Sequence, residues 1–398
     1  MKTKAAMAAT GVGLLSVLVG AMAPSAAGQS IPLSPTAQAS GAIITHDQGI
    51  EFVTIGDPGN APFTGNPPPG GSANGRGAVS YEYRIGRFEV TTEQWVEFFN
   101  AALDRPANDR LPHVVAPSTW GAVGAPAQNG GQRFRVPAGN EMRPVGNISW
   151  RMAAMYCNWL HNNKSTDRAA FMNGAYDVST FGYIGNIFTD QLTHNPEARY
   201  WIPTWDEWIK AAHYDPNRYG EGEGGYWAYS ITSDTQPIFG PPGAFGGLAQ
   251  SNCCWDQFTH PGMNPFAILL GAYPTVQSPW GLLDASGATT EWNEEVLTGS
   301  FGVRWRRLDG TAWSTPSGGI VIDLVGNSGD DFPSFSPYDF GFRIASAVPA
   351  PGTSTLILVC CVSVLTHRRR VWLSDRLSSS PPFSARSART PSPRSKRA

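Results

Sequence analysis

The chain has 398 residues, of which 41% are hydrophobic and only 15% are charged. This length allows one large domain or two ordinary ones, and the 44 glycines, 33 prolines and 14 tryptophans predict many turns around large aromatic anchors, which excludes a protein built from long helices. Residues 368–398 hold eight Arg and one Lys against one Asp, which gives this tail a net charge of +8. The rest of the chain has 20 basic against 30 acidic residues. The acidic main domain would repel phosphates, which excludes nucleic-acid binding by this domain.

Residues 1–27 follow the order of a secretory signal peptide. Lys2 and Lys4 precede an apolar run over residues 11–21, and small residues close the segment. The run is too short for the roughly 30 Å of a bilayer core, so we expect cleavage and export rather than a spanning helix. Residues 28–45 are rich in Ser, Ala, Pro and Gly and are predicted to form a linker.

Three helices are predicted by their capping residues. Each begins after a Ser or Thr that can accept a hydrogen bond from the first turn, and two of these caps have a Gln or Glu three residues later, which completes a capping box. Apolar residues then recur at helical spacing, so each helix offers one face to a common core. The caps are Thr91, Ser149 and Thr204, and the apolar faces are Trp95, Phe98, Phe99 and Ala102; Met152, Met155, Tyr156 and Trp159; and Trp205, Trp208, Ile209 and Ala212.

Strand signals in the sequence are short. We expect strands at 52–55, 81–90 and 340–344, where apolar residues cluster or alternate with other types. The segments 67–71 and 121–131 are rich in Pro, Gly or Ala and are predicted to be surface loops.

The five cysteines are Cys157 and two adjacent pairs, Cys253–Cys254 and Cys360–Cys361. In an exported protein, one interpretation is a disulfide between Cys157 and a member of the first pair. The other interpretation is a buried Cys157 that acts as a small hydrophobic residue.

Five sequence blocks, in order, resemble the formylglycine-generating (sulfatase-modifying factor) family. The most specific are 202–212, which reads IPTWDEWIKAA, and 279–292, which reads PWGLLDASGATTEW; the others are 83–91, 144–160 and 341–344. The resemblance covers residues 46–347. It implies an α+β fold, a single formylglycine-generating-enzyme-like domain that is related to C-type lectins and has much irregular structure.

Members of this family oxidise a substrate cysteine through a reactive cysteine pair that follows the Gly-x-x-x-Glu-Trp turn. In this chain no cysteine occurs between Cys254 and Cys360. The stretch 307–314 corresponds to the family's Arg-Gly-Gly-Ser-Trp, and from it to Gly341 no thiol is available to bind copper or exchange disulfides. Cys253 and Cys254 precede the turn, and adjacent cysteines form only a strained bridge. We therefore expect neither cysteine oxidation nor a copper cofactor.

The resemblance also implies a structural calcium at the turn before Trp292, where family members supply Asn and Glu oxygens. Glu291 is the best candidate ligand for this metal. Ala288 stands in place of the Asn, so one oxygen is missing, and a solvated acidic turn is the alternative interpretation. The seven histidines show no ligand spacing, and we assign them no role.

The carboxyl end resembles a bacterial PEP-CTERM sorting tail. Residues 348–370 contain a Pro-Ala-Pro sequence, an apolar run over 353–365 that would give about 20 Å of helix, and three arginines. The resemblance implies processing and sorting at the membrane, although Ala350 replaces the Glu of such tails. Residues 371–398 are predicted to be a disordered basic tail, and an Arg/Ser-rich RNA-binding tail is the alternative.

Together these features favour an exported, membrane-sorted protein of the cell envelope that has lost cysteine oxidation and binds an envelope ligand, a peptide or a glycan. One alternative is an oxidoreductase of the same superfamily with a different, metal-based site. Another is an extracellular lectin-like module that binds glycans through exposed tryptophans and carboxylates. The functional cleft is expected beside Trp292 and Trp313.

Overall fold

The computed structural model describes residues 42–65, 73–128, 131–255, 260–315 and 323–349. The predicted signal peptide at 1–27, the predicted loop at 67–71 and nearly all of the predicted sorting segment and tail lie outside these residues. In the described part of the chain, no helix has the length and apolar content needed to cross a bilayer.

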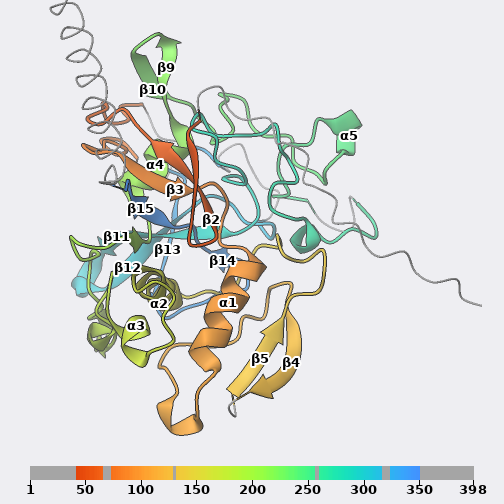
Figure 1. Ribbon diagram of the computed structural model, residues 1–398. Helices are drawn as coiled ribbons and strands as arrows, with labels where there is room; N and C mark the ends of the chain where they lie inside the picture. The colour runs from red at the N-terminus through yellow and green to blue at the C-terminus, as the bar shows by residue number, and fades with distance from the viewer. Residues whose placement is uncertain (1–41, 66–72, 129–130, 256–259, 316–322, 350–398) are drawn as a thin grey trace, which may run out of the picture. The chain divides into compact units, whose positions relative to one another are not determined.

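A five-stranded antiparallel sheet joins the beginning and the end of the described chain. The last strand, β15, lies between β3 and β8, with Ala345 opposite Ile85 on one side and Trp201 on the other. The C-terminal strand is therefore internal to the sheet (Figure 1). In order across the sheet, the strands are β1 (Ile44–Asp47), β2 (Ile50–Ile55), β3 (Tyr83–Gly86), β15 (Ala345–Ala347) and β8 (Tyr200–Trp201).

A four-stranded sheet is built around the long hairpin of β11 and β12. Its strands in order are β13 (Gly329–Asp331), β12 (Arg304–Asp309), β11 (Thr290–Thr298) and β14 (Phe340–Gly341), and β14 runs parallel to β11. The chain passes from β14 to β15 through Phe342 and Ile344, whose carbonyl oxygens accept hydrogen bonds from the main chain of Val90 and Gly86 at 2.9 and 2.7 Å. The prediction of one strand over 340–344 is therefore wrong, because this segment is shared between two sheets.

The three main helices begin directly after their predicted caps. They are α1 (Thr92–Leu103), α2 (Trp150–His161) and α4 (Trp205–His213). Capping boxes are present at Thr91 and Thr204, and the Ser149 hydroxyl accepts a hydrogen bond from the Met152 amide at 3.2 Å. The three predicted helices are confirmed. They could be predicted because a capping signal is local and does not depend on tertiary contacts.

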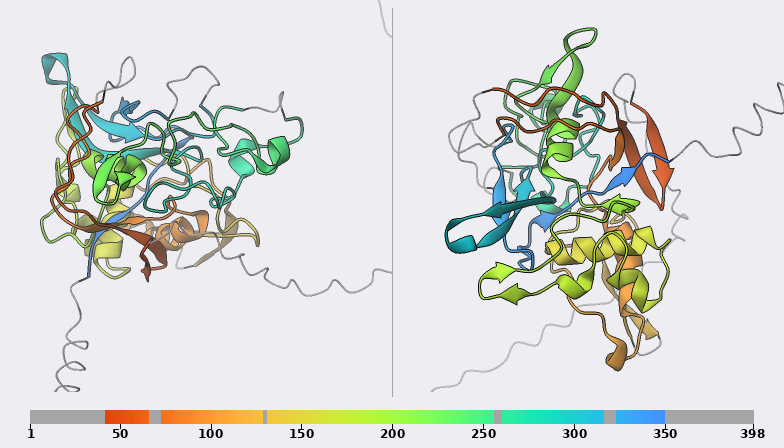
Figure 2. Two further views of the ribbon diagram at one scale, coloured as in Figure 1. Left: turned by 90° about the horizontal axis from the view of Figure 1, so that it is seen from above. Right: turned by 90° about the vertical axis from the view of Figure 1, so that its left-hand side faces the viewer.

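An aromatic cluster between α1 and α2 forms the centre of the main core. Trp95 stacks on Tyr156 with ring centroids 5.6 Å apart, and the Phe98 ring meets Trp159 edge-on at 5.6 Å. Phe342, in the link between the two sheets, packs edge-on against Trp95 and Tyr156. The two helices consequently lie side by side in all views (Figures 1 and 2).

Three hairpins and several short helices complete the described structure. The first hairpin replaces the surface loop predicted at 121–131, because the Asn100 side chain bonds both the N–H and the C=O of Phe134, whose ring packs on Trp120. The hairpins are β4 (Val123–Gln128) with β5 (Gly131–Arg135), β6 (Tyr183–Ile184) with β7 (Ile187–Phe188), and β9 (Tyr214–Gly220) with β10 (Glu223–Tyr226). The short helices are α3 (Arg168–Met172) and α5 (Ala244–Gly247), with 3-10 turns at Ala107–Asp109, Val178–Thr180, Pro265–Ala267 and Ser300–Gly302.

Candidate functional site

The Ser286-Gly287-Ala288 turn, which leads into β11, is fixed by contacts with a distant loop. The Ala288 amide donates a 2.7 Å hydrogen bond to the side-chain oxygen of Asn252, and the Gly287 amide donates to the Thr311 hydroxyl at 3.1 Å. Gly287 has φ +97°, and a side chain there would collide with Asn252. Glycine is needed for both reasons.

Glu291 follows this turn and forms a buried ion pair with Arg343. Its two carboxylate oxygens accept hydrogen bonds from the Arg343 guanidinium at 2.6 and 2.7 Å, and one of them also accepts from the Trp208 indole at 3.0 Å. Both charged side chains are almost completely buried. A calcium ion at this carboxylate would lie against a guanidinium cation, so these surroundings do not fit the calcium ligand that the sequence suggested.

Two further carboxyl groups lie near this ion pair in sites that favour the protonated form. Burial, and next the charge of Glu291, raise the pKa of Glu89 well above its ordinary value, although Glu89 accepts hydrogen bonds from the Thr289 amide and hydroxyl. Burial raises the pKa of Asp284 to about 6. Burial of these two carboxyl groups therefore makes each of them easier to protonate than the same group in water.

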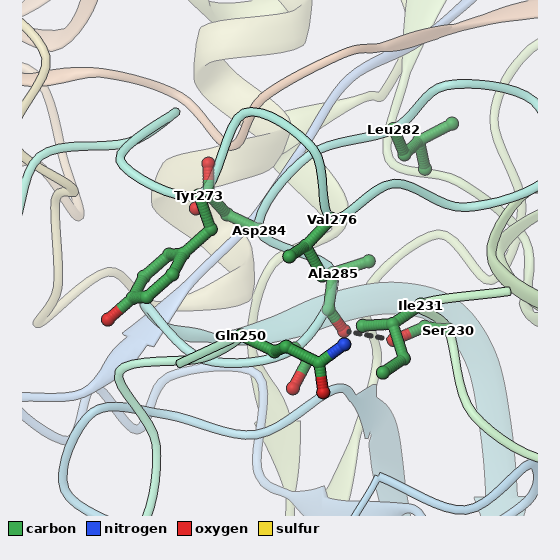
Figure 3. A pocket seen from close by; sticks show the side chains of 9 residues that line it. Ser230, Ile231, Gln250, Tyr273, Val276, Leu282, Asp284 and Ala285 are labelled. Carbon is green, nitrogen blue, oxygen red and sulfur yellow. Dashed lines mark hydrogen bonds between the residues drawn. The ribbon is translucent and has the colours of Figure 1, made fainter. Parts of the chain in front are cut away.

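A small polar cavity lies next to the turn (Figure 3). It is lined by Ser230, Ile231, Gln250, Tyr273, Val276, Leu282, Asp284, Ala285 and Ser286 and has a volume of about 10 Å³. That volume is close to the smallest that holds one water molecule. The cavity therefore cannot admit an organic substrate.

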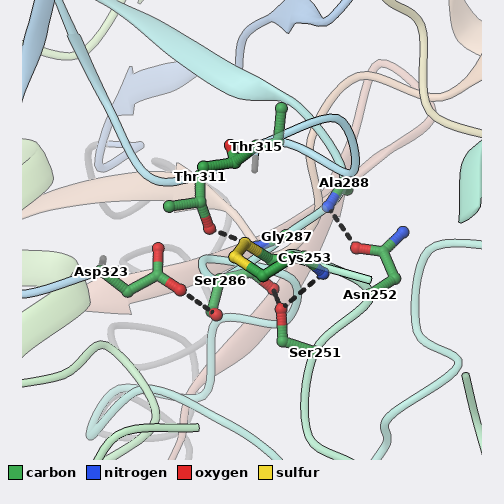
Figure 4. Close-up of a disulfide and its surroundings, with 11 residues drawn as sticks. Ser251, Asn252, Cys253, Ser286, Gly287, Ala288, Thr311, Thr315 and Asp323 are labelled. Carbon is green, nitrogen blue, oxygen red and sulfur yellow. Dashed lines mark hydrogen bonds between the residues drawn. A yellow bond between two sulfur atoms is a disulfide. The ribbon is translucent and has the colours of Figure 1, made fainter. Parts of the chain in front are cut away.

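On another side of the turn, Cys253 and Cys254 form a disulfide (Figure 4). The Cys253 amide donates to the Ser251 hydroxyl at 3.1 Å, and that hydroxyl donates to the Ser286 carbonyl at 3.0 Å. Cys157 is a free, buried thiol, so its role as a small hydrophobic residue is confirmed and its disulfide with this pair is not formed. The two cysteines precede the turn in sequence, yet folding brings them against it.

The Ser286 hydroxyl also donates a hydrogen bond to the carboxyl group of Asp323, a further buried acid at this turn. Burial raises the pKa of Asp323 to about 6. The turn is therefore surrounded by hydroxyl groups, an amide, a carboxyl group and one sulfur pair, which come from three other parts of the chain (Figure 4).

A second cavity lies away from the turn, between the β6–β7 hairpin and the segment after β13. It has a volume of about 250 Å³ and is lined by Tyr183, Gly185, Asn186, Phe332, Ser334 and Phe335, which we call the aromatic hollow. The hydroxyl groups of Tyr183 and Ser334 are 2.6 Å apart. Ile184, next to Tyr183 in the chain, is 74% exposed, and Phe301 is fully exposed. The β11–β12 hairpin, which carries Phe301, lies beside the β6–β7 hairpin (Figure 2).

The expected cleft beside Trp292 and Trp313 is not one of these cavities. Trp292 is fully buried, and its indole donates a 2.7 Å hydrogen bond to the Ile148 carbonyl. Trp313 is half-buried between Phe266 and Tyr338. The described tryptophans are buried or half-buried, and the most exposed aromatic side chains in this part of the chain are Tyr and Phe.

One histidine has a specific partner that sequence spacing could not reveal. The buried Glu294 carboxylate accepts hydrogen bonds from the backbone and ring Nδ1 of His194, the latter at 3.0 Å, and from the Tyr176 hydroxyl at 2.8 Å. Burial alone would lower the pKa of His194, but the hydrogen bond and charge of Glu294 raise it. Among the described residues, no group of three His, Cys, Asp or Glu side chains is placed to hold a metal ion.

The chain is similar to one protein family and to several solved structures. The model of the sulfatase-modifying factor enzyme 1-like domain matches residues 76–348. Similar solved structures include "CarF", with 18% identity, a TM-score of 0.45 and coverage of 75% of this chain and 99% of that one. They also include PvdO from Pseudomonas aeruginosa, with 14% identity, a TM-score of 0.43 and coverage of 78% of this chain and 99% of that one. Treponema denticola variable protein 1 has 17% identity, a TM-score of 0.41 and coverage of 77% of this chain and 99% of that one. No curated protein matches the sequence.

Proposed function

This chain belongs to the sulfatase-modifying factor enzyme 1-like family, and from that premise we propose that it is an exported member which binds a ligand at the cell envelope and does not convert cysteine to formylglycine. A fold supports many unrelated activities, so the function has to be argued from its sites. The observation that carries the binding proposal is the aromatic hollow, because it has a volume of about 250 Å³ and is open to solvent.

Absence of the oxidase chemistry is supported by the sequence of the last third of the domain. No cysteine occurs from Trp292 to Gly341, and Cys253 and Cys254 precede the Gly-x-x-x-Glu-Trp turn rather than follow it. A thiolate is the nucleophile and soft-metal ligand that cysteine oxidation requires. The Ser, Thr and Asp side chains that line the turn cannot take its place.

The ligand that best suits the aromatic hollow is a neutral glycan. Aromatic faces from Tyr183, Phe332 and Phe335 offer apolar contact, while Asn186 and Ser334 offer hydrogen-bonding groups, and no lining side chain is charged. The Arg151 guanidinium lies over one face of the Tyr183 ring, 4.8 Å from its centroid, and its charge is paired with the buried Asp190 at 2.7 and 2.8 Å. A volume of about 250 Å³ is just below the roughly 300–1,000 Å³ of pockets for drug-sized ligands, so the hollow suits one or two sugar rings of a longer chain.

Export and membrane sorting belong to the same proposal. Export is supported by residues 1–27, in which charged residues are followed by an apolar run and then by small residues. Sorting is supported by the apolar run and the arginine cluster within residues 348–370. A protein displayed in this way would meet glycans or peptides of the envelope as its partners.

Binding of neutral oligosaccharides to the purified protein, followed by calorimetry, tests the ligand proposal. We expect Tyr183→Ala and Phe335→Ala each to weaken binding about tenfold, which corresponds to the ~1.4 kcal/mol that a buried aromatic contact contributes. Tyr219→Ala is the matched control, because Tyr219 is 67% exposed on a different hairpin, β9–β10. Equal loss in the control, or binding of peptides but no glycans at the hollow, would contradict the glycan assignment.

A further inference from the structure

The Cys253–Cys254 disulfide cannot be explained as a stabilising staple. A disulfide stabilises a fold mainly by closing a loop in the unfolded chain, and this effect grows with the number of residues enclosed. Here the sequence separation is 1, so no residue is enclosed. The stabilising effect of loop closure therefore does not explain why a disulfide lies beside the turn at residues 286–288.

The backbone around the pair is held in costly conformations. Cys254, Ala288 and Asp323 have φ values of +65°, +55° and +62°, in the left-handed region that residues other than glycine rarely adopt. Such residues persist only where their surroundings fix them, and they cluster at functional sites. All three lie within the group of residues that surrounds the disulfide (Figure 4).

We propose that Cys253 and Cys254 form a redox site that exchanges between disulfide and dithiol with thiol compounds of low molecular weight. An incoming thiol loses its proton to solvent and attacks one sulfur as a thiolate, which forms a mixed disulfide and releases the other cysteine as a thiolate. A second thiol then attacks the mixed disulfide, and both cysteines take up protons. Two thiols are oxidised to one disulfide while the Cys253–Cys254 disulfide is reduced to two thiols, so atoms and electrons balance.

The structure distinguishes the two cysteines by the exposure of each residue to solvent. Cys254 is 7% exposed, whereas Cys253 is completely buried. Attack therefore occurs at Cys254, and Cys253 is the leaving group. The redox state is transmitted to the turn before β11, because Ser251 and Asn252, which precede the pair, bond Ser286 and Ala288.

The test is thiol mapping on the folded full-length protein. The protein is equilibrated with reduced and oxidised glutathione in fixed ratios, quenched with N-ethylmaleimide and digested, and labels are assigned by mass spectrometry. We expect the peptide that contains Cys253 and Cys254 to carry two labels after reduction and none after oxidation, reversibly and with an unchanged near-ultraviolet circular dichroism spectrum. A disulfide that reduces only after unfolding would overturn the proposal, and so would two thiols that never pair.

Single substitutions test which sulfur is attacked. In Cys253→Ser, the remaining Cys254 should form a mixed disulfide with glutathione; in Cys254→Ser, the buried Cys253 should react at least tenfold more slowly. Equal rates in two variants with unchanged melting temperatures would overturn the assignment of Cys254. If either variant fails to fold, reversible labelling of the unaltered protein still decides whether the pair is a redox site.

Discussion

Replacing Arg343 with Met is expected to lower the free energy of unfolding by about 3–5 kcal/mol. The change leaves Glu291 buried without its cation, although the hydrogen bond from the Trp208 indole is kept. It also removes hydrogen bonds from the guanidinium to the main-chain carbonyls of Gly86, Arg87 and Leu283 at 3.0 to 3.2 Å. Urea denaturation followed by tryptophan fluorescence measures the loss.

An exposed ion pair provides the control for this substitution. Arg168 pairs with Asp109, and both side chains are more than 40% exposed, so Arg168→Met should change the stability by less than about 1 kcal/mol. The double variant Arg343→Met with Glu291→Leu should recover part of the loss, because it removes the unpaired charge. If Arg343→Met is no more destabilising than Arg168→Met, the buried pair does not stabilise the fold as expected.

Ending the chain after Asp331 is expected to abolish the cooperative folding of residues 46–347. The truncation removes β15, which pairs with β3 on one side and β8 on the other, and with it Phe342 and Arg343. Loss of an internal strand divides the five-stranded sheet and opens the aromatic cluster of α1 and α2. Near-ultraviolet circular dichroism and calorimetry should show neither a native signal nor a single melting transition.

Ending the chain after Pro349 is the matched control, because every strand and helix of the described structure is then kept. This shorter deletion should leave the melting temperature within a few degrees of that of the full chain. A protein that ends at Asp331 and still melts in one native-like transition would show that the final strand is dispensable.

The elements that the sequence predicted well are those whose signals are local. Thr91, Ser149 and Thr204 cap helices because their hydroxyl groups reach amides only three residues away, and the apolar spacing that follows is equally local. The elements that were missed depend on distant partners. The hairpin over 123–135 is held by Asn100, and the segment 340–344 is divided because β14 and β15 pair in different sheets.

The candidate sites were harder to predict because they join segments far apart in the sequence. Glu291 has the carboxylate that a calcium site needs, but Arg343, 52 residues later, occupies it. The aromatic hollow combines residues near 184 with residues near 334, and no spacing rule links them. Cys253 and Cys254 precede the turn in the sequence, and only the folded chain shows that their neighbours Ser251 and Asn252 bond it directly.

The central claim is that the domain keeps the family fold without its cysteine-oxidising chemistry. The direct measurement is to incubate the purified protein with a sulfatase-type cysteine peptide, oxygen, copper and a thiol reductant, and to search for the aldehyde product by mass spectrometry. A family member that retains its cysteine pair serves as the positive control, and variants with Ser in place of Cys157, Cys253 and Cys254 show which sulfur any activity needs. We expect the unaltered protein to leave the peptide unchanged, because no cysteine occurs between Trp292 and Gly341. Formation of the aldehyde at a rate near that of the control would contradict this expectation.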